Sequence, residues 1–245
     1  MTLRSFIVAV QFLTRVPTPS LADFRPDDVS RASLFFPLVG LLLGIVLVAL
    51  AALSAPAGSM VAALLVVIAW IWITGALHID GLGDIADAFG AAHRDPARFL
   101  EVLRDPHMGT FGVLAIVLQV LAKFVLVDAV VRLGAPLLGL ALVPAWARWT
   151  ILVVSHWTEP LATGSGARFK MAIAPIALAG NLAALVVASA FVAPALLVAP
   201  FIAAGFVLYW RTVLGGITGD CLGASVELTE STLLLALVVV ASLLR

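Results

Sequence analysis

The sequence predicts an all-α protein, a polytopic integral-membrane bundle of about seven transmembrane helices. Of its 245 residues, 63% are apolar and 11% are charged, and the mean hydropathy is +1.17. A soluble domain is roughly half apolar and a quarter charged, because it must cover its core with a polar surface. Long uncharged stretches recur along the chain. We therefore expect a single transmembrane catalytic domain over residues 1–245.

The expected elements follow in chain order. A short helix over residues 6–13 is bordered by Arg4 and Arg15 on one face and is expected to lie at the membrane interface. No small-residue cleavage pattern follows it, so we do not interpret it as a removable signal. Spans are expected at residues 34–54, 60–77, 110–131 and 137–155, twice within 171–210 with a turn near 192–194, and last at 232–244. The last run is short unless its helix begins near Ser225, and the alternative is therefore about six spans.

The distribution of basic residues predicts the orientation. Lys and Arg are retained on the cytoplasmic side of a membrane. With a cytoplasmic N-terminus, only Arg132 and Arg245 of the basic residues outside the spans fall on the far side. Acidic residues then collect at the cytoplasmic end, including Glu227 and Glu230. We expect a multi-pass protein of the cell inner membrane with an active site that faces the cytoplasm.

Charge balance and cysteine usage exclude other classes. Fourteen Lys and Arg balance fourteen Asp and Glu, so nucleic acid is not an expected partner. Cys221 is the only cysteine and can form no intrachain disulfide. Membrane lipid is the expected surrounding, and a homo-oligomer stays open.

The segment that follows the second span carries three carboxylates on one helical face. Asp80, Asp84 and Asp87 are spaced by four and three residues. Like charges at this spacing repel, and oxygen ligands of this kind suit Mg²⁺ or Mn²⁺. Gly81 and Gly83 would let a phosphate or a neighbouring helix approach closely. The alternative is that the acids only solvate the end of a span.

Two further segments combine charge with glycine. Arg104, Asp105 and His107 precede Gly109; the arginine could clamp a phosphate, and the acid or the imidazole could handle a proton. A helix-entry turn around a proline would use similar residues. Nearer the C-terminus, Asp220 follows a glycine-rich turn and could complete a metal shell, although a plain structural turn is the alternative.

Two cations lie within expected spans. Lys123 and Arg148 would be expensive there without a partner, so we expect each to meet a substrate or a carboxylate. Lys123 could instead extend its side chain toward the outer face.

These segments together resemble cobalamin synthase, the adenosylcobinamide-GDP ribazoletransferase family. The resemblance covers nearly the whole chain and rests on residues 12–19 (FLTRVPTP), 36–40 (FPLVG), 78–88 (HIDGLGDIADA), 104–109 (RDPHMG) and 218–224 (TGDCLGA). It implies that adenosylcobinamide-GDP reacts with α-ribazole or its 5′-phosphate, that GMP is released and that Mg²⁺ is required.

On this basis we assign expected roles. The metal ligands are Asp80, Asp84, Asp87 and Asp220; the catalytic residues are Asp105, His107 and Asp87; the substrate contacts are Arg104, His78, Gly81, Gly83, Lys123, Arg148 and Gly219. Two alternatives stay open: a transferase that uses a CDP-activated alcohol, and a corrinoid or ion-coupled transporter. The CDP-alcohol pattern places an Ala-Arg pair soon after the Asp-Gly, where this chain has Gly83 and Asp84.

Overall fold

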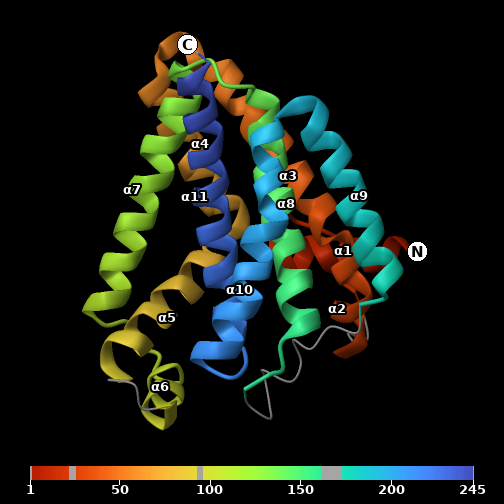
Figure 1. Ribbon diagram of the computed structural model, residues 1–245, viewed down its shortest axis with the longest axis vertical. Coiled ribbons are helices and arrows are strands. Elements are labelled where there is room, and N and C mark those ends of the chain that lie inside the picture. Colours follow the sequence, from red (N-terminus) through yellow and green to blue (C-terminus); the bar gives the residue numbers. More distant parts are fainter. Residues whose placement is uncertain (1, 22–25, 93–95, 162–172, 245) are drawn as a thin grey trace.

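A computed structural model describes residues 2–21, 26–92, 96–161 and 173–244, which form a bundle of helices (Figure 1). The helices are α1 (Leu3–Leu13), α2 (Pro26–Ala32), α3 (Phe36–Ser54), α4 (Ser59–Thr74), α5 (Leu77–Ala92), α6 (Pro96–Val102), α7 (Thr110–Arg132), α8 (Leu137–Trp157), α9 (Pro175–Val192), α10 (Ala199–Val213) and α11 (Gly219–Leu243). Short 3-10 turns lie at η1 (Ser33–Phe35), η2 (Ala55–Ala57) and η4 (Pro194–Val198).

The number of spans agrees with the sequence prediction. Within the described residues, six helices are long and apolar enough to cross a membrane, and the bent pair α4 and α5 makes up to seven. The turn expected near residues 192–194 falls between α9 and η4. Arg25, Arg94, Arg168 and Lys170, which contribute to the expected orientation, lie outside the described residues.

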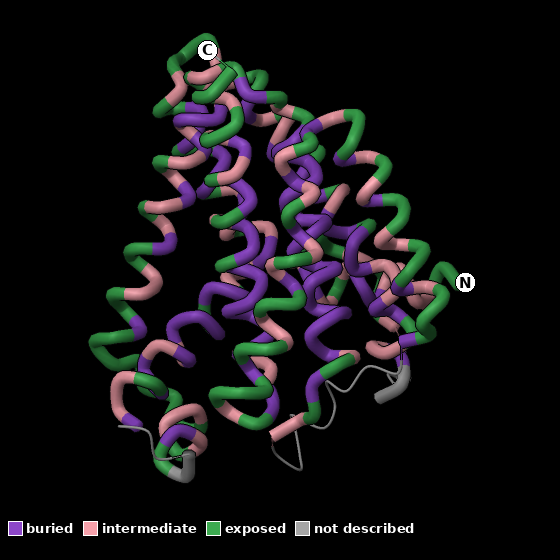
Figure 2. The backbone as a smooth tube through the Cα atoms, in the orientation of Figure 1, coloured by how far each residue is buried: buried purple, intermediate pink, exposed green. Residues whose placement is uncertain are grey.

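Helix α8 is the centre of the bundle. The most apolar stretch of α8 is 89% buried. Buried residues concentrate on the inner helices, whereas α9 and α10 expose much of their length (Figure 2). Helix α3 packs directly on α8 because Gly40 and Gly44 carry no side chain. A methyl group at Gly40 would lie 2.4 Å from the Pro144 carbonyl oxygen. The spacing of these glycines therefore serves a contact within the chain.

The second expected span, residues 60–77, corresponds to α4 and ends in a sharp bend. Helix α4 ends at Thr74, and α5 leaves it at an angle of 87°. Gly75 and Ala76 form the bend with positive φ angles of 62° and 60°. The Arg15 backbone N–H donates to the Ile73 carbonyl at 2.7 Å and ties the N-terminal segment to the bend. As a result, α5 runs obliquely toward the end of the bundle that lies opposite the C-terminus (Figure 1).

The prediction for the last span was wrong at its start. Helix α11 begins at Gly219 and has 25 residues, so it is long enough to cross a membrane. The Thr218 side chain caps it by accepting a hydrogen bond from the Cys221 N–H. The sequence prediction began the span after Glu227 and Glu230, because these two acids interrupt the apolar run. Both are buried inside the bundle and do not lie at its end.

Candidate active site

The candidate site forms where α5 crosses α11. A methyl group at Gly81 would lie 3.0 Å from the Asp220 Cα, and one at Gly223 would lie 3.0 Å from the His78 carbonyl oxygen. Glycine on each helix therefore lets the two backbones approach closely. Gly81, predicted as a substrate contact, is buried in this crossing. Gly83 is also buried, where a methyl group would meet the Met108 and Ile116 side chains at 2.9 Å.

Carboxylates gather around this crossing. Asp84 lies within electrostatic reach of Asp80, Asp220 and Asp87. Asp80 is exposed, and Asp84 and Asp220 are half-buried. Among the described residues, no Lys, Arg or His forms an ion pair with any of these four acids. The crossing therefore concentrates negative charge that the described protein side chains leave unpaired.

Asp87 has a local role that the sequence analysis missed. Its carboxylate accepts hydrogen bonds from the Gly109 N–H at 2.6 Å and the Gly112 N–H at 2.8 Å. These are orphan donors in the first turn of α7, whose own N-cap residue, Gly109, makes no side-chain bond. A methyl group at Gly112 would lie 2.3 Å from the Asp87 carboxylate. This contact gives Asp87 a structural role that needs no metal, and we therefore draw the proposed metal ligands from the other three acids.

The remaining acids suit a cation that a substrate helps to hold. Within the described part of the chain, no three His, Cys, Asp or Glu side chains converge closely enough to form a metal cage by themselves. Mg²⁺ is commonly bound by one or two carboxylates together with water and substrate phosphates. Asp80, Asp84 and Asp220 provide oxygen ligands of this type around one crossing, so the donor set fits Mg²⁺ completed by a diphosphate.

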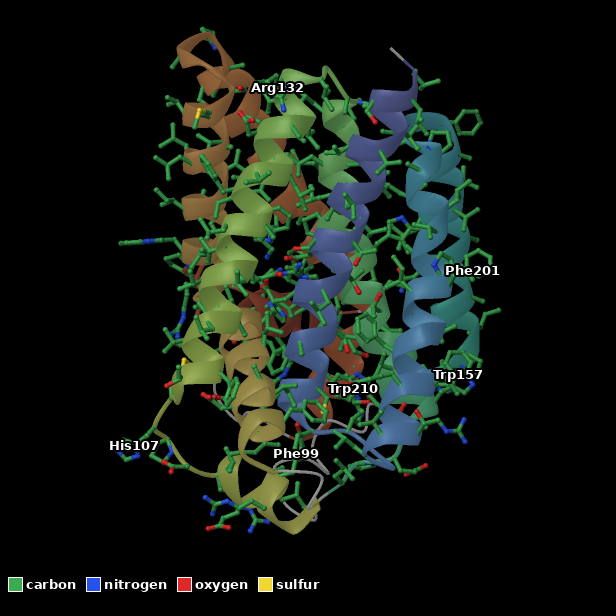
Figure 3. The ribbon with its side chains drawn as sticks, turned by 60° about the vertical axis from the view of Figure 1, so that its left-hand side comes forward. Phe99, His107, Arg132, Trp157, Phe201 and Trp210 are labelled. Atoms are coloured by element: carbon green, nitrogen blue, oxygen red, sulfur yellow. The ribbon has the colours of Figure 1, made fainter. Side chains whose placement is uncertain are left out.

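The connection between α6 and α7 carries the second predicted group. His107 Nδ1 lies 2.7 Å from Asp105 Oδ1, and the His107 backbone N–H donates to the same oxygen at 3.0 Å. These hydrogen bonds lower the pKa of the Asp105 carboxyl, the backbone one most. The His107 ring is directed away from the bundle (Figure 3). Arg104 is exposed on the same connection. The structure therefore pairs Asp105 with His107 but does not bring His107 into contact with the acids of α5.

The glycine-rich turn before Asp220 is a structural element. Gly215 has a φ of 73°, and a methyl group at Gly216 would lie 2.6 Å from the Glu159 carbonyl oxygen. The Ile217 N–H donates to that same carbonyl at 2.9 Å. Gly219, predicted as a substrate contact, is the first residue of α11. The turn thus anchors the start of α11 and presents Asp220 to α5.

The two intramembrane cations have carboxylate partners. Lys123 Nζ lies 2.6 Å from Glu227 Oε2 and 2.5 Å from Glu230 Oε2, and Arg148 pairs with Glu230. The sequence analysis expected each of these cations to meet a substrate or a carboxylate. In the structure, both meet a carboxylate. His78, on the other side of Arg148, has Nδ1 3.5 Å from Arg148 Nη2. The sequence contains one indication of this cluster, namely the high free-energy cost of placing an unpaired charge inside a membrane.

The helices and the crossing define a polytopic helical membrane protein with an acidic candidate site between two of its helices. The sequence profile of cobalamin-5-phosphate synthase matches residues 5–238. The chain belongs to this family.

Relatives match over nearly the whole chain. One from Novosphingobium aromaticivorans is 48% identical over 244 residues, which cover 97% of each chain. Others from Laribacter hongkongensis and Thiobacillus denitrificans are 49% and 44% identical; the matches cover 97% of both chains in the first and 95% and 94% in the second. Each of these relatives is named adenosylcobinamide-GDP ribazoletransferase. No solved structure matches the chain.

Proposed function

We propose that this protein is an adenosylcobinamide-GDP ribazoletransferase that requires Mg²⁺. It joins adenosylcobinamide-GDP to α-ribazole or α-ribazole 5′-phosphate, releases GMP and forms adenosylcobalamin or its 5′-phosphate. The reaction takes place at the cytoplasmic face of the inner membrane. The similarity to proteins named ribazoletransferases, at 48% and 49% identity over nearly the full length, supports this function. It favours this function over a CDP-alcohol transferase or a transporter, the two alternatives that the sequence left open.

The chemistry is a phosphoryl-group transfer. A ribose hydroxyl of the acceptor attacks the phosphorus attached to cobinamide and forms a new P–O bond. The bond from that phosphorus to the bridging oxygen of the diphosphate breaks, and GMP leaves with this oxygen. The proposed acceptor of the hydroxyl proton is Asp105 or His107, and the acceptor substrate would have to reach their connection, because the structure does not bring His107 to the acids of α5. The ionised Asp105 carboxylate orients the imidazole through Nδ1.

The remaining residues bind and orient the anionic donor. Asp80, Asp84 and Asp220 would hold Mg²⁺, which when bound neutralises charge on the diphosphate and on departing GMP. Arg104 would bind diphosphate oxygens bidentately. Most of the rate then comes from positioning and charge stabilisation. The proposal depends on one observation. At the α5 and α11 crossing, no Lys, Arg or His among the described residues neutralises the group of acids.

A defined reconstitution tests the proposal. Purified protein in liposomes is incubated with adenosylcobinamide-GDP, α-ribazole and Mg²⁺, and products are separated by chromatography. We expect a complete cobamide and one equivalent of GMP, with no reaction when EDTA replaces the metal. Competition by GMP but not CMP would distinguish the reaction from a CDP-alcohol transfer. Corrinoid uptake into the liposomes without GMP formation would contradict the proposal.

A further inference from the structure

A cluster of four charges lies inside the bundle, apart from the candidate site. Lys123 of α7 contacts both Glu227 and Glu230 of α11, and Glu230 also contacts Arg148 of α8. The exposed fractions of Lys123, Arg148, Glu227 and Glu230 are 2%, 1%, 5% and 0%. Two cations thus balance two anions in a region shielded from solvent.

Neutral side chains fix the geometry of this cluster. Gln119 Nε2 donates to Glu227 Oε2 at 2.9 Å and to the Glu227 backbone carbonyl at 2.8 Å. Lys123 Nζ also lies 4.6 Å from the centroid of the Trp70 ring, which comes from α4. The cluster therefore joins α4, α7, α8 and α11 through oriented contacts.

The cluster reaches both helices that carry the acids. On α5, His78 Nδ1 lies 3.5 Å from Arg148 Nη2, and Asp80 follows His78 by two residues. On α11, Glu227 follows Asp220 by about two turns, so both project from nearly the same face. The His78 backbone also packs against Gly223 at the crossing. Displacing the cluster would therefore move α5 relative to α11.

Stability alone does not account for this arrangement. The free-energy cost of removing the charges from water offsets the gain from their mutual attraction. Well-packed apolar residues often hold helices together equally well. In some proteins, buried ion pairs and hydrogen bonds instead specify a single placement of the elements that they join. We infer that the four charges form a positioning cluster, which sets how α5 lies on α11 and thereby the separation of Asp80 and Asp220. This inference rests on the proposed function, because the acids are its proposed metal ligands.

A charge-balanced double variant tests the inference. Lys123→Met combined with Glu227→Gln removes one cation and one anion, and leaves Glu230 paired with Arg148. We expect the purified variant to unfold at the wild-type temperature but to lose about tenfold to a hundredfold in kcat/KM. The Mg²⁺ concentration for half-maximal rate should rise. Lys123→Arg, which keeps the charge, should retain most activity, and neutralising the exposed Arg98 and Glu101 pair should change neither quantity.

A structural readout separates this inference from the reaction itself. Spin labels at Phe89→Cys on α5 and Leu228→Cys on α11, both partly exposed, report the placement of the helices by pulsed electron resonance. We expect the double variant to shift or broaden the distance distribution. If the double variant does not fold, Gln119→Met provides the same comparison without altering charge. A wild-type distribution with wild-type kinetics would overturn the inference. If the wild-type protein forms no cobamide, the proposed function fails, whereas the label distances still test positioning.

Discussion

Gly81 lies against the backbone of Asp220, so the helix that carries two of the candidate metal ligands rests directly on the residue that supplies the third. A methyl group at Gly81 would lie 3.0 Å from the Asp220 Cα and 3.1 Å from its carbonyl oxygen. Both neighbours are backbone atoms, which cannot rotate away as a side chain would. The spacing of the acids therefore depends on a residue that itself bears no functional group.

Gly81→Ala should reduce activity through this contact. The methyl group must push α5 and α11 apart by a few tenths of an ångström, and we expect a loss of about tenfold in kcat/KM. Helix propensity gains about 1 kcal/mol from the substitution, and this offsets part of the overpacking. Gly180→Ala on α9 is the matched control, because a methyl group there meets nothing within 4 Å. Steady-state kinetics of both variants make the comparison, and equal rates would show that activity does not depend on the close approach of α5 to α11.

Asp87→Asn should weaken folding rather than metal dependence. An amide offers one acceptor oxygen where the carboxylate accepts from both Gly109 and Gly112. We expect a loss of about 1–2 kcal/mol in the free energy of unfolding. Thermal unfolding in detergent measures this loss, and a Mg²⁺ titration of the rate should give the wild-type midpoint. A large rise in that midpoint would return Asp87 to the metal ligands.

His107→Ala should shift the pH dependence of turnover. Hydrogen bonds from His107 lower the pKa of Asp105, so the carboxylate stays ionised as pH falls through its usual range. The backbone N–H, which lowers the pKa most, remains in this variant, so loss of the imidazole raises the pKa of Asp105 only part of the way toward its ordinary value. Activity that needs the ionised form is then lost at a slightly higher pH. Rate profiles on the acidic side test the shift, with His156→Ala as control. An unmoved acid limb would mean that Asp105 does not limit the reaction there.

Cysteine labelling tests the proposed orientation. Arg132 and His107 lie at opposite ends of the bundle (Figure 3), and Cys221 is fully buried, so background labelling is small. We expect a membrane-impermeant maleimide to label Arg132→Cys in intact cells. Glu101→Cys, on the exposed side of α6, should react only after permeabilisation. The reverse pattern would place the acids on the periplasmic side.

Most of the spans were predictable from the sequence because apolar length decides them. The start of α11 was not, because Glu230 resembles a surface charge until its partners are known. Those partners, Lys123 and Arg148, are 107 and 82 residues away in the chain. The grouping of Asp80 with Asp84 follows from helical spacing, whereas the arrival of Asp220 depends on a tertiary crossing. One feature of the sequence indicated the role of Asp87. Glycine stands at the N-cap of α7 and offers no capping side chain, so the first N–H groups of that helix needed a distant acceptor.

We propose that the acids at the α5 and α11 crossing hold the metal that the transfer requires. The most direct measurement is Mg²⁺-dependent GMP release by purified Asp84→Asn in liposomes, beside Glu101→Gln as a control for an exposed acid. We expect wild-type release by the control, and for Asp84→Asn a fall of about a hundredfold or more that added Mg²⁺ restores at most in part. Wild-type turnover by a folded Asp84→Asn protein at an unchanged Mg²⁺ midpoint would contradict the proposal.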